Sequence, residues 1–187
     1  MKRYIFLDVE TTGLSPHKGD RVIEIGCVEV INGFITGRVF HSYFKTFTKI
    51  SDDAYNIHGI NQKFLKDKPL FGEKLDDLLG FISNSTIIAH NAKFDVNFIH
   101  YEINNCGGNI EYLHANCLFL DSLEIFRKMF PRQKNDLESL CKRYNVYFEN
   151  IREKHTAILD AWLLSIIIIK MGFFDKKSYL KNFNEYN

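Results

Sequence analysis

The chain has 187 residues, of which 45% are hydrophobic and 25% are charged. This balance is typical of a globular protein with one substantial core, and no repeat, low-complexity tract or linker divides the sequence. The formal net charge of +1 argues against a protein that holds nucleic acid by a broad basic surface, because that mode needs many lysine and arginine contacts to phosphate. A compact site where metal ions supply the positive charge stays compatible with this charge.

The sequence shows no sign of export or membrane insertion. Asp8 interrupts the first apolar run too early for a signal peptide. The longest apolar stretch, residues 161–169, is far shorter than the ~20 residues of a membrane helix. The four cysteines are scattered without a CxxC pair, so neither a disulfide framework nor a zinc site is expected. We expect a cytoplasmic protein with reduced cysteines and no membrane contact.

The first predicted elements are strands. Residues 4–9 form an apolar run, and residues 22–31 alternate well enough for a second strand. Asn32 and Gly33 then give a strong hairpin signal into a third strand over residues 34–44. The chain therefore opens with three antiparallel strands.

Helices and strands alternate in the rest of the chain. The patterns predict short buried strands over residues 85–90 and 116–123. They predict helices over residues 73–82, 92–105, 135–145 and 156–171, and the third of these has an Asn or Asp at its start that can cap it. Antiparallel strands followed by alternating strand and helix indicate an α/β fold with a mixed five-stranded sheet flanked by helices.

Two acids follow the first apolar run. Asp8 and Glu10 are two residues apart, so on a strand they point the same way and Val9 points the opposite way. Two ionised carboxylates crowded at the end of a buried strand repel each other unless a cation lies between them. The alternative is that the strand ends near Leu7 and both acids are solvated in a loop.

Three residues far along the chain extend this pair. Asp95 lies in the first turn of a predicted helix directly after a buried strand, where it could equally well only stabilise the helix. Asp160 lies early in a very apolar helix, among alanines and leucines, and His155 stands just before that helix. Taken alone, His155 is also compatible with an ordinary surface histidine.

Four acids and one histidine make up a set suited to two-metal phosphoryl chemistry. Carboxylate oxygens are preferred ligands of Mg²⁺ and Mn²⁺. Two such ions ~3.5–4 Å apart can stabilise both the attacking and the leaving oxygen of an in-line displacement. A histidine near the attacking water can act as general base.

These residues belong to three motifs, which read DVETTGL (8–14), HNAKFD (90–95) and HTAILDA (155–161). In this order and at these separations they resemble the exonuclease motifs of the DEDD family of 3′–5′ exonucleases, in its histidine-containing DEDDh branch. Two further segments, residues 55–60 and 120–146, resemble the proofreading subunits of bacterial replicative polymerases. The resemblance covers residues 3 to 172, and it implies a ribonuclease H-like fold with an exonuclease domain over residues 1–172 and a short tail over 173–187.

The resemblance also implies roles for particular residues. Asp8, Glu10, Asp95 and Asp160 would hold two Mg²⁺ or Mn²⁺ ions, and His155 would activate the water. The residues implied to bind or support the terminal nucleotide, besides Asp8, Glu10 and Asp160, are Thr11, Thr12, Gly13, Leu14, Asp53, His58, Asn91 and Phe94. Read without the resemblance, residues 11–13 can be an ordinary turn and His58 can merely close a loop.

The sequence departs from the family pattern at two places. Thr156 stands where close relatives commonly have glycine, and it could cap the following helix. Residues 178–183, SYLKNF, lack the glutamine and spacing of a convincing clamp-binding motif.

The function expected from the resemblance is metal-dependent 3′–5′ hydrolysis of single-stranded or frayed DNA ends to nucleoside 5′-monophosphates, as the proofreading partner of a polymerase catalytic subunit. A sliding-clamp contact is doubtful because the clamp motif is unconvincing. Two alternatives stay open: a stand-alone DEDDh exonuclease that trims RNA 3′ ends, and a catalytically silent interaction subunit. The interpretation that assigns no function to these acids is a chance grouping in an ordinary α/β domain.

Overall fold

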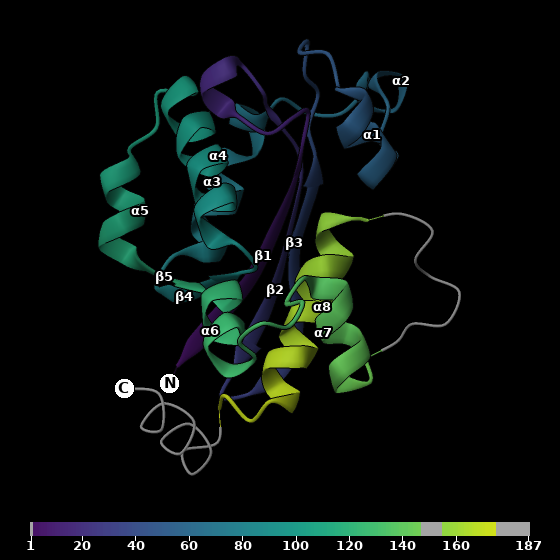
Figure 1. The fold of residues 1–187 in the computed structure, drawn as a ribbon. Coiled ribbons are helices and arrows are strands. Elements are labelled where there is room, and N and C mark those ends of the chain that lie inside the picture. Colours follow the sequence, from purple (N-terminus) through teal and green to yellow (C-terminus); the bar gives the residue numbers. More distant parts are fainter. Residues whose placement is uncertain (1, 147–154, 175–187) are drawn as a thin grey trace.

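A central sheet with helices against both of its faces forms the body of the molecule (Figure 1). The computed structural model describes residues 2–146 and 155–174. The strands are β1 (Arg3–Thr11), β2 (Val22–Ile31), β3 (Phe34–Tyr43), β4 (Ser85–Ala89) and β5 (Cys117–Asp121). The helices are η1 (Pro16–Lys18), α1 (Asp52–His58), α2 (Gln62–Leu65), η2 (Phe71–Lys74), α3 (Leu75–Ile82), α4 (Ala92–Asn105), α5 (Ile110–Asn116), α6 (Ser122–Met129), α7 (Leu137–Tyr144) and α8 (Ala157–Lys170).

The strands lie in the order β3-β2-β1-β4-β5. β1 and β2 are antiparallel, as are β2 and β3, whereas β4 runs parallel to β1 and to β5. The predicted α/β class, with a mixed five-stranded sheet that opens with three antiparallel strands, is confirmed. β1 is the middle strand, so its C-terminal end can be reached by elements from both halves of the chain.

The hairpin between β2 and β3 is also confirmed. Asn32 and Gly33 have positive φ angles of 52° and 86°, and Ile31 pairs with Phe34 across them. Both central residues of a type I′ turn need this left-handed conformation, which asparagine and glycine tolerate best. β2 is buried along almost all its length, as expected of a strand covered on both faces, while β3 is largely exposed at the sheet edge.

Apolar side chains cover both faces of the sheet. On one face, Ile5, Leu7 and Val9 of β1 pack in a cluster with side chains of α3 and α4. On the other face, Phe6 and Val28 pack in a cluster with side chains of α6, α7 and α8. Figure 1 shows α3 and α4 on one side of the sheet and α7 and α8 on the other. The side chains of Asp8 and Glu10 follow Phe6 in the strand alternation, so they belong to the α8 face.

The predicted boundaries differ from the structure in places. The strand predicted over residues 116–123 is wrong at its C-terminal end: β5 stops at Asp121, whose Oδ1 accepts a hydrogen bond from the Leu123 backbone N–H at 2.8 Å and opens α6. The helices α1, α2, α5 and α6 were not predicted. Each has at most eight residues, too few for a helical period to stand out from the surrounding sequence.

The other predicted helices are confirmed. α4 has the predicted bounds, and α3, α7 and α8 match within two residues. Asp136 caps α7 by accepting a hydrogen bond from the Ser139 N–H at 2.8 Å. Thr156 occupies the N-cap position of α8, but its side chain makes no capping hydrogen bond.

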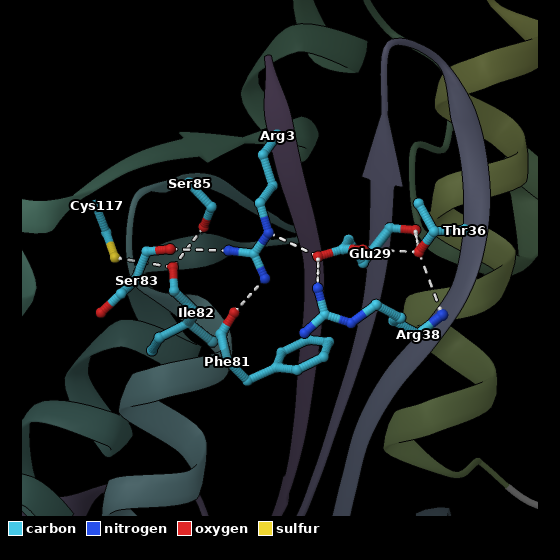
Figure 2. A network of polar contacts seen from close by, with 9 residues as sticks. All are labelled: Arg3, Glu29, Thr36, Arg38, Phe81, Ile82, Ser83, Ser85 and Cys117. Carbon is cyan, nitrogen blue, oxygen red and sulfur yellow. Dashed lines mark hydrogen bonds and ion pairs between the residues drawn. The ribbon is translucent and has the colours of Figure 1, made fainter. Parts of the chain in front are cut away.

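A buried ion-pair network ties the start of β1 to β2, β3 and α3 (Figure 2). Glu29 is 1% exposed. Its Oε1 accepts hydrogen bonds from Arg3 Nε at 2.6 Å and Arg38 Nη1 at 3.1 Å, and its Oε2 accepts from Thr36 Oγ1 at 2.8 Å. The Arg3 guanidinium also donates to the carbonyl oxygens of Phe81 and Ser83 at the end of α3. Each oxygen of this buried carboxylate therefore has a donor.

All four cysteines lie in the described part of the chain and are reduced. In residues 2–146 and 155–174, the helices are all too short or too polar to cross a membrane. Phe173 and Phe174, the first residues of the expected tail, pack edge-on against Tyr4 with ring centroids 6.0 and 4.9 Å away. The rest of that tail, with the SYLKNF segment, lies outside the described residues.

Candidate active site

The two acids of β1 are strand residues and not loop residues. Asp8 pairs with Gly26 of β2, and Glu10 pairs with Glu24. Both acidic side chains point to the α8 face, while Val9 between them is buried in the cluster on the opposite face. The alternative in which the strand ends near Leu7 is therefore wrong.

A glycine in β2 brings α8 onto the sheet beside these acids. A Cβ at Gly26 would lie 2.3 Å from the backbone Cα and N of Ile158, so only glycine lets the first turn of α8 approach this closely. Gly26 stands directly opposite Asp8. The close approach carries Asp160 to the acids of β1, and carboxylate oxygens of Asp8, Glu10 and Asp160 lie within 4.8 Å of one another.

The fourth predicted acid lies just outside this group. Asp95 is in the first turn of α4 and only 2% exposed. Among charged neighbours it has the largest effect on Asp8, where its negative charge adds to the effect of burial in raising the pKa. Burial also raises the pKa of Asp95, although hydrogen bonds from the backbone N–H groups of Asp95 and Val9 oppose this shift.

Crowding of these acids creates a site that favours a cation. Burial, and then the negative charges of Asp95, Asp160, Glu10 and Glu24, raise the pKa of Asp8 well above its usual range. Full ionisation is unfavourable in this arrangement unless positive charge is supplied. The three converging donors are carboxylates, the ligand type that Mg²⁺ and Mn²⁺ prefer. The residues present therefore fit a divalent metal ion.

His155 lies beside the acids and is oriented by one of them. Its Nδ1 is 2.8 Å from Asp160 Oδ2, and its backbone N–H donates to the Ile57 carbonyl at 3.3 Å. When Nδ1 donates to the carboxylate, the neutral ring carries its lone pair on Nε2. The side chain is 43% exposed, so a substrate or water can approach it.

Residues 11–14, which the resemblance assigns to the nucleotide pocket and which we call the pocket turn, are held in place by side-chain hydrogen bonds. Thr11 Oγ1 donates to the Gly13 carbonyl at 2.6 Å, and the buried Thr12 hydroxyl donates to Asp20 Oδ1 at 3.2 Å. A Cβ at Gly13 would lie 2.5 Å from the Asp20 carboxylate. Leu14 follows with 83% of its surface exposed, so it is available to pack against a ligand.

The remaining predicted residues differ in their burial and in the contacts that they make. His58 is 4% exposed, and its Nδ1 accepts a hydrogen bond from the Ile60 N–H at 2.9 Å, so it does close the loop after α1. Asp53 lies exposed in the first turn of α1. Asn91, with a φ angle of 75°, donates its backbone N–H to Asp121 Oδ1. Phe94 packs on Phe98 with ring centroids 4.9 Å apart.

Sequence reasoning missed three residues that shape this site: Glu24, Gly26 and Asp20. Gly26 gave a signal, because an isolated glycine inside a strand pattern indicates close backbone approach. Glu24 is a charged residue inside an otherwise apolar strand, which is the same kind of signal that drew attention to Asp8. Asp20 gave no signal, because acids are common in turns.

Comparison with known proteins gives the same family as the motifs. The family model described as Exonuclease (RNase_T) matches residues 5–167. The DNA polymerase III subunit epsilon of Buchnera aphidicola subsp. Baizongia pistaciae is 41% identical over 196 residues, covering 97% of this chain and 80% of the relative. The same subunit of Buchnera aphidicola subsp. Schizaphis graminum is 44% identical over 174 residues, covering 91% of this chain and 74% of the relative.

Solved structures share the fold at low sequence identity. The nuclease domain of 3′hExo, described as a DEDDh family member bound to rAMP, superimposes with a TM-score of 0.76 at 14% identity and 93% coverage of both chains. The ribonuclease H-like fold expected from the motifs is therefore confirmed. The family model spans most of the chain and the relatives are matched over most of their length, so the chain belongs to the exonuclease family and, within it, to the 3′–5′ exonucleases named DNA polymerase III subunit epsilon.

Proposed function

We propose that this chain removes nucleotides from single-stranded or frayed DNA 3′ ends as the proofreading partner of a polymerase catalytic subunit. The observation that carries the proposal is the convergence of Asp8, Glu10 and Asp160 within 4.8 Å beside the His155–Asp160 hydrogen bond. The epsilon subunits that it resembles belong to DNA polymerase III, which favours DNA and a polymerase partner.

The metal site would use the acids from three separate elements. Asp8 and Glu10 of β1, Asp160 of α8 and Asp95 of α4 are the residues that would hold two Mg²⁺ or Mn²⁺ ions. When bound, such ions lower the pKa of water and stabilise charge on the attacking and leaving oxygens of a phosphodiester. The four carboxylates come from rigid helices and strands, so their positions are set before the ions bind.

His155 would act as the general base. Asp160 holds the ring through Nδ1 and thereby presents Nε2, which can take the proton from the attacking water. The bond between the His155 backbone N–H and the Ile57 carbonyl fixes the base to the end of α1. Positioned bases of this kind contribute typically ~10²–10⁴-fold to the rate.

The terminal nucleotide would lie between the pocket turn and α1. Leu14 is exposed and can pack on the base, while the backbone of residues 11–13 lines the sugar and phosphate. His58 and Asp53 of α1 would approach the 3′ end. A paired end must first unstack to enter such a site, which is easier for a mismatch. This is the physical basis for selective removal of misincorporated nucleotides, and the domain that does it would extend over residues 1–172.

RNA trimming is the second candidate. The similarity to 3′hExo bound to rAMP is a likeness of fold, and the residue types assigned to the pocket do not by themselves exclude a 2′-hydroxyl. Matched single-stranded DNA and RNA of the same sequence would separate the two substrates, and faster cleavage of RNA would contradict the DNA assignment. A catalytically silent subunit is disfavoured because all five chemical residues are present.

The test is a time course on a primer–template with a 3′ mismatch, with Mg²⁺, with Mn²⁺ and with EDTA. His155→Ala is expected to lose about 100-fold or more of the cleavage rate while its unfolding transition stays close to that of the parent chain. The matched control is His114→Ala, an exposed histidine of α5, which should cleave at the parent rate. Parent-like cleavage by the His155 variant, or cleavage in EDTA, would overturn the mechanism.

A further inference from the structure

Glu24 is a buried acid beside the site that none of the three exonuclease motifs contains. It lies in β2, pairs with Glu10 on one side and with Tyr43 of β3 on the other, and is 0% exposed. Residues directly opposite each other on antiparallel strands point to the same face. Glu24 therefore shares a face with Asp8 and Glu10, one strand further from the centre of the sheet.

One oxygen of Glu24 is held and the other is not. Oε1 lies 2.8 Å from Nε2 of His41, a β3 residue opposite Gly26. Oε2 is buried and has no hydrogen-bond partner among residues 2–146 and 155–174. Tyr43 lies opposite Glu24 on β3, and burial, the charge of Glu24 and a side-chain hydrogen bond with Glu24 raise the pKa of the Tyr43 hydroxyl to about 12. A buried carboxylate oxygen that lacks a donor is unfavourable.

Two other glutamates of the described chain are equally buried, and both are neutralised by arginine. Glu29 lies on the same strand and pairs with Arg3 and Arg38 (Figure 2). Glu102 of α4 pairs with the Arg21 guanidinium. Glu24 has the imidazole of His41 and the hydroxyl of Tyr43 beside it and Glu10 opposite it, and its charge contributes to raising the pKa of Asp8. Among residues 2–146 and 155–174, no arginine forms an ion pair with Glu24.

The distances limit how Glu24 could meet a cation. It is not part of the group whose carboxylate oxygens lie within 4.8 Å of one another, so it stands behind Asp8 and Glu10 and not among them. A negative charge close to the ligands of a metal ion strengthens cation binding without direct coordination, because the Coulomb attraction falls only with the inverse of the distance and is weakly screened in a buried site.

We propose that Glu24, anchored by His41, is a positioning residue of the divalent-cation site, acting through the negative charge that it places one strand away from Asp8 and Glu10. This inference rests on the metal-dependent function proposed above. It explains why a carboxylate without a full set of donors is kept at 0% exposure at this position.

The test uses Glu24→Gln, which keeps the shape and the bond to His41 but removes the charge. Mn²⁺ binding is measured by calorimetry on the parent and variant chains without DNA, and thermal unfolding is measured in EDTA. The dissociation constant for Mn²⁺ should rise about tenfold or more. In EDTA the unfolding temperature should stay the same or rise, because one like charge has been removed from the cluster of acids. If Glu24 had only a structural role, Glu24→Gln would lower the unfolding temperature in EDTA and leave the dissociation constant for Mn²⁺ unchanged.

Two variants serve as controls. Glu29→Gln removes a charge of the same type and burial from the same strand, and it should lower the unfolding temperature without changing Mn²⁺ affinity. Tyr43→Phe removes the hydroxyl next to Glu24 but leaves the charge of Glu24 in place, so Mn²⁺ affinity should stay within about twofold of the parent value.

The outcomes separate this inference from the proposed function. If the parent chain binds Mn²⁺ and Glu24→Gln binds it equally well, the inference is wrong and the metal site stands. If Glu24→Gln and Tyr43→Phe both lower the unfolding temperature in EDTA with unchanged Mn²⁺ affinity, Glu24 serves the fold and the inference is again wrong. If the parent chain itself binds no Mn²⁺, or binds it as well after Asp8→Asn, the proposed metal site and this inference both fail.

Discussion

Gly26 sets the distance between the acids of β1 and the acid of α8. Its missing side chain is what allows the α8 backbone to lie against β2 at the level of Asp8. A single carbon atom added here has no room, because the atoms it would meet are backbone atoms at 2.3 Å. The precision of the site therefore depends on a residue that has no chemistry of its own.

Gly26→Ala is predicted to impair both stability and catalysis. The added methyl group must push α8 away from β2, which should cost about 1–3 kcal/mol or more of unfolding free energy, as for other overpacked cores, and should move Asp160 away from Asp8. Urea unfolding and the rate of nucleotide release measure the two effects. Gly80→Ala is the matched control: Gly80 lies within α3 and a Cβ there meets nothing within 4 Å, so stability should increase by roughly 0.5–1 kcal/mol with unchanged activity. An active and stable Gly26→Ala chain would contradict this role.

Single residues also show why the sequence located the site but not its surroundings. Asp8 and Asp160 each interrupt an apolar pattern, and Asp95 opens a predicted helix directly after a buried strand; these features are visible without coordinates. Their convergence depends on the parallel pairing of β4 with β1 and on the crossing of α8 over Gly26, which are tertiary features. The bond between His155 and Asp160 joins residues five apart, yet the loop geometry that directs the ring could not be read from the sequence.

At the scale of elements, the strands were easier to predict than the short helices. β2 and β3 were visible because their apolar alternation and the Asn32-Gly33 turn agree with each other. α1 and α2 cover only a small cluster around Ile23, Ile50 and Leu65, so few of their residues are apolar and no period develops. β5 was predicted too long because Asp121 both ends the strand and caps α6, and the apolar residues after it belong to the helix.

Glu29→Gln tests how strongly β1, β2, β3 and α3 are joined at the start of β1. Removing the charge leaves Arg3 and Arg38 without their counter-ion, and we expect a loss of about 3 kcal/mol, as is typical for one partner of a buried pair. Burial alone would raise the pKa of Glu29, but hydrogen bonds from Arg3 and Thr36 and the charges of Arg3 and Arg38 lower it below its usual value.

The sign of this shift fixes the pH dependence of the effect. A carboxyl whose pKa is lower in the folded chain stabilises it above the unfolded pKa of about 4.3, and this contribution is lost as the pH falls through the folded pKa. The difference in unfolding free energy between parent and Glu29→Gln should therefore be constant near neutrality and shrink below about pH 4. Urea titrations over this range measure it, and a difference that grows on acidification would show that the ion pair is not its source.

At the scale of the whole molecule, the acids of the site couple stability to pH and to metal. The pKa values of Asp8 and Asp95 are raised in the folded chain. A raised carboxyl pKa favours the folded chain at low pH, and this contribution is lost as the pH rises from the unfolded value of about 3.9 toward the folded value. A bound divalent cation relieves the repulsion that appears over this range.

Stabilisation by Mn²⁺ should therefore be larger at about pH 8 than at about pH 5, where protons compete for the same carboxylates. Metal at about 100 times its dissociation constant adds about 2.7 kcal/mol, which corresponds to a shift in unfolding temperature of roughly 5–10 °C for a chain of this size. Thermal unfolding with Mn²⁺ and with EDTA at both pH values tests this. Asp8→Asn should abolish most of the shift, and a shift of equal size at both pH values would contradict the coupling.

The contribution of α8 also has a consequence for the order in which the chain is made. Asp8 and Glu10 lie within the first ten residues, whereas the proposed base His155 and the last acid of the candidate site, Asp160, come far later in the chain. A ribosome synthesises the amino-terminal strands long before α8 emerges. A nascent chain can therefore form the hairpin of β2 and β3 while it still lacks His155 and Asp160. Under the proposed mechanism, cleavage can begin only after α8 has docked on the sheet, so folding of the last helix would switch on the activity.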